Sequence, residues 1–198
     1  MLFPKFSKIV VAKIGLVVFV LCLIYSCENE FLPRPKGYFR IDFPEKKYTE
    51  FNQDFPYSFE YPIYAKPSVY QGNINGKYWL NLNFEKLRAT LHLSYFVVNN
   101  DIHKHFEDSR KLVYKHTIKA DAINENTIYF PAKKVYGSVY EIKGNAASTL
   151  QFYVTDSTKH FLRGALYFNV PPNADSLAPI NEFIIKDIQH LVGSLSWN

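Results

Sequence analysis

Hydrophobic and polar residues alternate in several short segments of the chain, a period of two that is typical of half-buried β-strands. In the first such segment, Tyr57 to Tyr61, aromatic side chains alternate with Ser58 and Glu60. Two further segments, 78–84 and 89–98, are separated by only four residues and therefore predict a hairpin. The remaining alternating segments predict a second antiparallel set, at 127–129, 135–142, 149–155 and 161–168.

Two other segments show the spacing of three and four residues that is typical of an amphipathic helix. The first spans Asp101 to His116, with Asn100 or Asp101 as its N-cap. The second is about 18 residues long, carries an apolar stripe from Ile180 to Leu195 and is capped by Asp175 or Ser176. We assign its polar residues to the exposed face: Glu182, Lys186, Asp187 and Gln189. These elements predict an α+β fold in which an antiparallel sheet is flanked by two helices.

The N-terminus has the pattern of a bacterial lipoprotein signal peptide. Lys5 and Lys8 precede an apolar stretch whose uninterrupted part, residues 14–25, is too short for the ~20 residues of a membrane-spanning helix. The stretch ends in Leu-Ile-Tyr-Ser-Cys at 23–27, which resembles a lipobox. We therefore predict that residues 1–26 form a cleaved signal peptide and that Cys27 is acylated. An uncleaved N-terminal helix is the alternative.

The segment after Cys27 is rich in proline and aromatic residues and shows no helical period. We predict that residues 27–54 form a lipid-anchored extended strap and that residues 55–198 form one globular domain. A flexible spacer would be rich in glycine, serine and charge. We therefore expect the strap from Tyr38 onward to dock on the domain or on a partner.

Composition and charge exclude several classes of protein. The 198 residues are 47% hydrophobic and 21% charged, which excludes wholesale disorder. The net charge is +5, but three lysines lie in the predicted signal peptide, and without them 20 basic residues face 18 acidic ones. Nucleic-acid binding needs clustered surplus positive charge, so we do not expect it. Both cysteines, Cys22 and Cys27, lie at or before the lipidation site, so the mature domain has no disulfide.

The sequence contains no motif of a known catalytic or metal site: no HExxH, GxSxG, GxxxxGK[ST] or CxxC. We therefore expect neither an enzyme nor a cofactor. One polar set, Asp156, His160 and Arg163, together with His116 and Asp121, could form an acid–base or anion site if strand pairing brought its members together. The alternative is a hydrogen-bonded turn beside a buried pair of Arg163 with a carboxylate.

Trp79 and Trp197 could form a platform for stacking against a sugar. The simpler interpretation is core packing for Trp79 and a frayed terminus for Trp197, because aromatic residues in strands usually belong to the core.

The chain resembles the gliding-motility lipoprotein GldD family of Bacteroidetes over nearly the whole mature sequence. The most specific matching segments are Pro35–Ile41 (PKGYFRI) and Gln151–Phe168. Further matching segments are Phe55–Pro62, His92–Tyr95, Tyr114–Asp121, Gly144–Ser148 and Pro172–Pro179. One departure is Phe55, where the family is associated with a cysteine, so a role for that thiol does not apply here.

This resemblance implies a periplasm-facing envelope lipoprotein that serves as a non-enzymatic accessory or assembly factor of gliding machinery coupled to type IX secretion. Its implied partners are the membrane, through the acyl anchor, and other envelope proteins of that machinery. The order of elements is also similar to the PsbP-like fold, which by itself implies no function. The competing hypothesis is a periplasmic lipoprotein that binds or hydrolyses glycan or lipid in a cleft formed by His160, Asp156 and Arg163.

Overall fold

The structure, a computed structural model, describes residues 40–51, 53–70 and 76–198, together with residues 13 and 16. The other residues of the predicted signal peptide, Cys27 and the strap as far as Phe39 lie outside the described residues. Ile41–Asn198 form one compact unit, which therefore includes the later part of the predicted strap. No helix within the described ranges is both long enough and apolar enough to span a bilayer.

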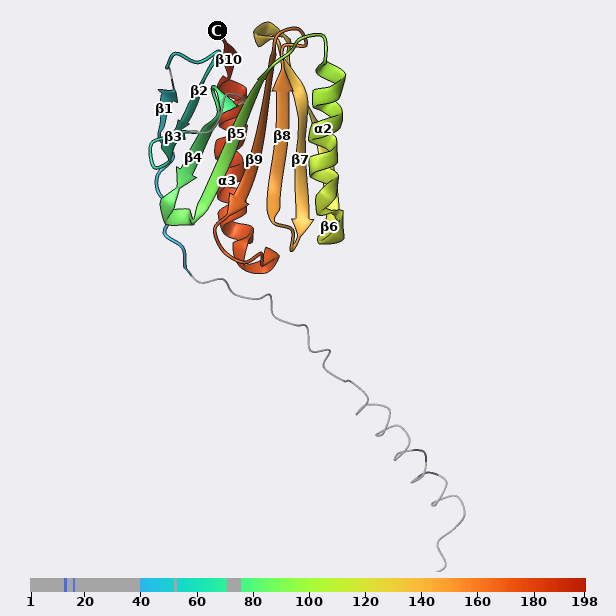
Figure 1. The fold of residues 1–198 in the computed structure, drawn as a ribbon. Coiled ribbons are helices and arrows are strands. Elements are labelled where there is room, and N and C mark those ends of the chain that lie inside the picture. The colour runs from blue at the N-terminus through green and yellow to red at the C-terminus, as the bar shows by residue number, and fades with distance from the viewer. Residues whose placement is uncertain (1–12, 14–15, 17–39, 52, 71–75) are drawn as a thin grey trace, which may run out of the picture. The chain divides into compact units, whose positions relative to one another are not determined.

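The centre of this unit is a seven-stranded antiparallel sheet with the strand order β3-β4-β5-β9-β8-β7-β6 (Figure 1). Its strands are β3 (Lys66–Val69), β4 (Leu80–Phe84), β5 (Ala89–Val97), β6 (Ala120–Phe130), β7 (Val135–Gly144), β8 (Ser148–Thr155) and β9 (His160–Phe168). β4 and β5 form the predicted hairpin, and residues 85–88 form its loop.

β5 and β9 pair along their whole length, from Ala89 opposite Phe168 to Val97 opposite His160. This pairing joins the early hairpin to the later strands. The two antiparallel sets expected from the sequence are therefore halves of one sheet, because strands that are distant in sequence supply its central contact.

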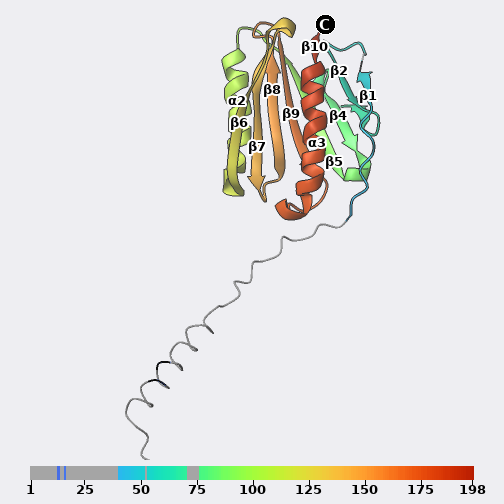
Figure 2. The same ribbon diagram turned by 180° about the vertical axis from the view of Figure 1, so that it is seen from behind.

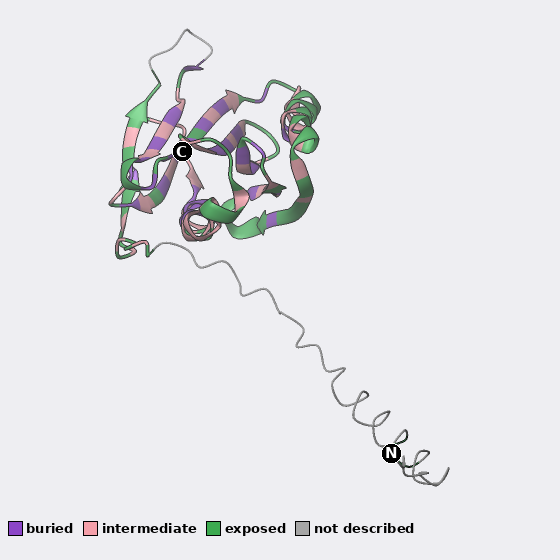
Figure 3. Ribbon diagram, turned by 90° about the horizontal axis from the view of Figure 1, so that it is seen from below, coloured by how far each residue is buried: buried purple, intermediate pink, exposed green. Residues whose placement is uncertain are grey.

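The helices α2 (Ile102–Tyr114) and α3 (Ala174–Ser194) cover opposite faces of the sheet, as the two views in Figures 1 and 2 show. Leu162 of β9 belongs to the same core cluster as Ile184 of α3. Val113 of α2 packs instead with Tyr140 and Ile142 of β7. Buried and more exposed residues alternate along the strands (Figure 3). The predicted α+β class, with an antiparallel sheet and two helices, is confirmed.

A second, three-stranded antiparallel sheet has the order β1-β2-β10, with β1 at Tyr48–Phe51, β2 at Tyr57–Pro62 and β10 at Ser196–Trp197. Phe51, from the predicted strap, is 2% exposed and belongs to the main core cluster. Trp197 pairs with Tyr57, so the expectation of a frayed terminus at Trp197 is wrong. Residues near both ends of the compact unit therefore complete its core.

Several element boundaries differ from the sequence prediction, most of all those of α3 and β6. α3 has 21 residues and its N-cap is Asn173, whose side chain accepts a hydrogen bond from the Ser176 amide, rather than Asp175 or Ser176 itself. β6 has 11 residues where the alternation predicted only 127–129. β6 is an edge strand whose side chains are mostly exposed on both faces, so burial imposes little alternation on it.

Candidate functional site

Asp156 organises the turn between β8 and β9. Its Oδ1 accepts hydrogen bonds from the backbone N–H groups of Thr158, Lys159 and His160 at 3.0, 2.8 and 2.8 Å. The Thr158 hydroxyl donates to Oδ2 at 2.7 Å. Partial burial acts to raise the pKa of Asp156, but these donors outweigh it and lower the pKa to about 2. The carboxylate therefore holds a turn together, as the hydrogen-bonded interpretation of the sequence proposed.

His160 lies at the start of β9, on the α3 face of the sheet. Its Nδ1 lies 2.8 Å from the Tyr95 hydroxyl, and its ring stacks on Trp197 with the ring centroids 5.2 Å apart. Burial lowers the pKa of His160, and the charge of Asp156 opposes that change. The imidazole is therefore held between two aromatic side chains.

Arg163 lies on the opposite, α2 face of the sheet. Successive residues of a strand point to opposite faces, and Leu162, next to Arg163, faces the α3 core. The Arg163 guanidinium donates a hydrogen bond to Gln151 Oε1 at 2.7 Å, so its partner is an amide and not the carboxylate that the sequence suggested. Burial lowers the pKa of Arg163. His160 and Arg163 therefore cannot line one cleft.

The structure brings one further member of the set close to Arg163. Burial lowers the pKa of His116, and the positive charge of Arg163 lowers it further. Asp121 is exposed and lies at an irregularity near the start of β6, beside Gly144. The five predicted residues thus divide into Asp156 with His160, Arg163 with His116, and Asp121 by itself.

Asp187 is a polar residue whose importance the sequence analysis missed. It lies in α3, is 1% exposed, and is buried rather than on the exposed face to which we assigned it. Its Oδ1 accepts hydrogen bonds from Lys46 Nζ at 2.5 Å and from the Tyr48 hydroxyl at 2.9 Å, and its Oδ2 accepts one from the Tyr64 hydroxyl. One carboxylate therefore attaches the strap and the loop after β2 to α3.

The same cluster changes the chemistry of the residues around it. Burial, followed by the hydrogen bond to Asp187, raises the pKa of Tyr48 to about 12, and the pKa of Tyr64 rises still further. Lys46 Nζ also lies 3.8 Å from the centroid of the Phe183 ring. A signal was present in the sequence: Asp187 lies three residues after Ile184 and four before Leu191, within the apolar stripe.

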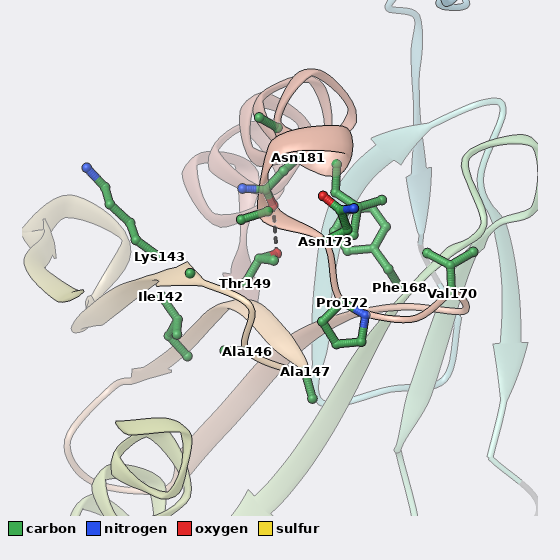
Figure 4. Close-up of a pocket in the computed structure, with 14 residues that line it drawn as sticks. Ile142, Lys143, Ala146, Ala147, Thr149, Phe168, Val170, Pro172, Asn173 and Asn181 are labelled. Carbon is green, nitrogen blue, oxygen red and sulfur yellow. Dashed lines mark hydrogen bonds between the residues drawn. The ribbon is translucent and has the colours of Figure 1, made fainter. Parts of the chain in front are cut away.

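Cavities open at several places on the compact unit. One of about 190 Å³ lies between the β7–β8 turn and the first turns of α3 (Figure 4). Its walls are mainly small apolar side chains, and Thr149 donates to Asn181 Oδ1 at 2.6 Å across it. A cavity of about 350 Å³ lies between β6 and α3, and one of about 460 Å³ lies between α2 and β5.

No group of three or more His, Cys, Asp or Glu side chains within the described ranges is arranged to hold a metal ion. Trp79, partly buried, packs against the core and donates from Nε1 to the Tyr95 carbonyl at 2.9 Å. That contact agrees with core packing for Trp79.

Comparison with known families assigns the chain. A family model described as gliding motility lipoprotein GldD matches residues 28–197. The chain belongs to the GldD family. A member of this family is a lipoprotein of gliding motility, and so is anchored to a membrane of the cell envelope. The family is not one of known enzymes.

Two other comparisons add little about function. No curated protein sequence matches the chain. Among solved structures, the chain is similar to the solution structure of cyanobacterial PsbP (CyanoP) from Synechocystis sp. PCC 6803. The two are 11% identical, the match covers 78% of this chain and 95% of that chain, and the TM-score is 0.48.

Proposed function

We propose that this GldD-family protein is acylated at Cys27, faces the periplasm and acts as a non-enzymatic accessory or assembly factor of gliding machinery coupled to type IX secretion. The family match carries the proposal: it begins at Glu28, directly after the cysteine of the lipobox. Several acyl chains on one residue anchor a domain stably, whereas a single chain is marginal.

In this proposal the anchor increases partner binding by restricting the search to one membrane. A tethered domain meets its partners at a raised effective concentration without any stronger single contact. The strap is fixed to the domain by Phe43, which stacks on Phe183 at 4.4 Å, and by Lys46. The chain from Glu28 to Asp42 can extend at most roughly 50 Å. The domain therefore works close to the membrane, where other envelope proteins of the machinery lie.

The first test concerns the strap segment 31–39. We would replace it with a Gly/Ser linker of equal length and keep both Cys27 and everything from Arg40 onward. Phe51 and Lys46 remain, so the thermal unfolding of the domain should not change. We expect the variant to reach the membrane but to lose both its association with envelope partners in pull-downs and its support of gliding.

The wild-type protein is the matched control. Both proteins are expressed at the same level in cells that lack the chromosomal gene. If the linker variant restores gliding and recovers the same partners as the wild type, the strap has no role in partner binding. If neither protein supports gliding, the proposed function itself fails.

A further inference from the structure

The cavity of about 460 Å³ lies beside the edge of β5 that faces away from β9. β4 pairs with this edge only as far as Leu80 opposite Leu93, so among the described residues no strand pairs with residues 94–97 there, and this is the free edge of β5. The chain before β4 leaves the sheet at Tyr78, whose φ of 66° is unusual for a bulky residue. On the same edge, the Tyr95 carbonyl already accepts a hydrogen bond from Trp79 Nε1. Because alternate residues share an edge, the N–H and C=O of Val97 point to this same side.

Arg163 lines this cavity, and among the described residues no carboxylate forms an ion pair with it. Its one hydrogen-bond partner among the described residues is the neutral amide of Gln151. Asp108 also lines the cavity, but none of the ion pairs between described residues includes Arg163. Keeping a partly buried guanidinium without an acidic partner costs stability.

Two buried nitrogen atoms near Arg163 have no hydrogen-bond partner among the described residues. Gln151 is 1% exposed, and its Nε2 is buried without a hydrogen-bond partner. His105 Nε2 is likewise buried without a hydrogen bond, although Asp101 Oδ1 lies 3.4 Å away. Lys77 and Lys104 line the cavity too. The lining, with Arg163, Lys77 and Lys104 against Asp108, therefore has an excess of positive charge.

We propose that this cavity receives an acidic side chain of a partner protein, presented by an extended segment that pairs with the free edge of β5. An added strand would lie about 10 Å from β9, two strand spacings away. The side chains of Arg163 and of a glutamate on the added strand, both pointing to the α2 face, together span that distance. The planar guanidinium can then donate two parallel hydrogen bonds to the carboxylate. The Val97 backbone groups supply the pairing.

This inference deepens the proposed function by giving the chemistry of one partner contact, and it rests on the partner being a protein. It can be tested by binding alone. A failure to bind would thus be distinct from a failure in the gliding assay, which tests the proposed function.

The experiment uses the full mature lipoprotein in detergent micelles and two labelled probes, Ac-Thr-Val-Glu-Val-Thr-amide and the same peptide with glutamine in place of glutamate. Fluorescence anisotropy reports binding. We expect the glutamate peptide to bind at least roughly tenfold more tightly than the glutamine peptide, because only it supplies a charge to Arg163. Arg163→Met should reduce that ratio to about one, whereas Arg110→Met, an exposed arginine of α2, should leave it unchanged.

A second variant tests the strand edge and does not depend on Arg163. Val97→Pro removes an N–H that faces the free edge, where proline is tolerated, so the fold should persist while both peptides lose binding. Val97→Thr is the control and should bind as the wild type does. The proposal is overturned if the two peptides bind the wild type equally, if neither binds, or if the preference for glutamate survives in Arg163→Met.

Discussion

Asp187 joins three segments that are far apart in the sequence through a single carboxylate. Lys46 and Tyr48 come from the strap, Tyr64 follows β2, and all three donate to it. An almost fully buried carboxylate is tolerated here because each of its oxygens has donors and one donor is charged. Removing the carboxylate would leave two hydroxyl groups without this acceptor and the Lys46 ammonium with the Phe183 carbonyl but no acidic partner.

Asp187→Ala should therefore lower the free energy of unfolding by roughly 3 kcal/mol, the lower end of the range for a broken buried ion pair, since Lys46 is partly exposed. Urea denaturation followed by circular dichroism measures the change. Glu182→Ala, an exposed acidic residue of the same helix, is the control and should change stability by less than about 0.5 kcal/mol. Equal effects for the two variants would contradict this account of Asp187.

Asp156 gives a prediction for the dependence of stability on pH. Its folded-state pKa of about 2 lies below the ordinary value of 3.8, so its contribution is present at neutral pH and is lost as the pH falls from about 4 to 2. Asp156→Asn should melt at a lower temperature than the wild type at pH 7. The difference should shrink across that acid window, as thermal unfolding at a series of pH values would reveal. A difference that stays constant down to pH 2 would exclude this role.

At this scale the sequence predicted some residues well and others poorly. The sequence offered two interpretations of Asp156, a hydrogen-bonded turn and an acid–base or anion site. The turn was predictable because a short polar segment between two strands needs hydrogen bonds. His160 and Arg163 lie on opposite faces of the sheet because they are three residues apart in one strand. The sequence could not show this, because it did not establish that β9 begins at His160. Asp187 was wrongly assigned to the exposed face of α3. The helical period predicts which residues share a face, but only the tertiary contacts show that Lys46, Tyr48 and Tyr64 surround this carboxylate.

The central strands require close contact at Gly164. A Cβ at this position would lie 2.1 Å from Cε1 of Phe152, which is directly opposite on β8 and is 1% exposed. The buried ring has no room to withdraw. Gly164 therefore permits β8 and β9 to pair beneath the Phe152 side chain.

Gly164→Ala should lower the free energy of unfolding by about 1–3 kcal/mol through overpacking. Gly193 in α3 offers a matched control, because a Cβ there would meet no atom within 4 Å. Gly193→Ala should leave stability unchanged or raise it by up to about 1 kcal/mol, since alanine favours helix. Chemical denaturation measures the free energy of unfolding of both variants. A destabilisation of the same size in both would contradict the packing argument.

Elements with one buried face were the ones that the sequence predicted best. The β4–β5 hairpin and α2 have clear periods because burial selects one side of each. β6 was largely missed because an edge strand exposed on both faces leaves no such pattern. β10 is only two residues long, and its pairing with β2 depends on partners that are distant in sequence, so no local pattern predicts it.

The state of Cys27 is the first property of the whole molecule to measure. Membrane-extracted wild-type protein should have lost residues 1–26 and gained the mass of its acyl chains, because a lipobox, which residues 23–27 resemble, directs both modifications. Intact-mass spectrometry of the wild type and of Cys27→Ser tests this prediction. The variant should lack the acyl mass, whereas an unmodified full-length wild type would contradict both the anchor and the proposed localisation.

The contact between Lys46 and Asp187 joins residues that are 141 positions apart. During synthesis, the strap is made early and the helix that holds it is made almost last. A chain that crosses a membrane with its N-terminus leading therefore cannot close this domain until α3 has emerged. Until that moment β1 can pair with β2, but Lys46 and Tyr48 lack the carboxylate that attaches them to the rest of the domain, so the last step of folding waits for a single side chain of α3.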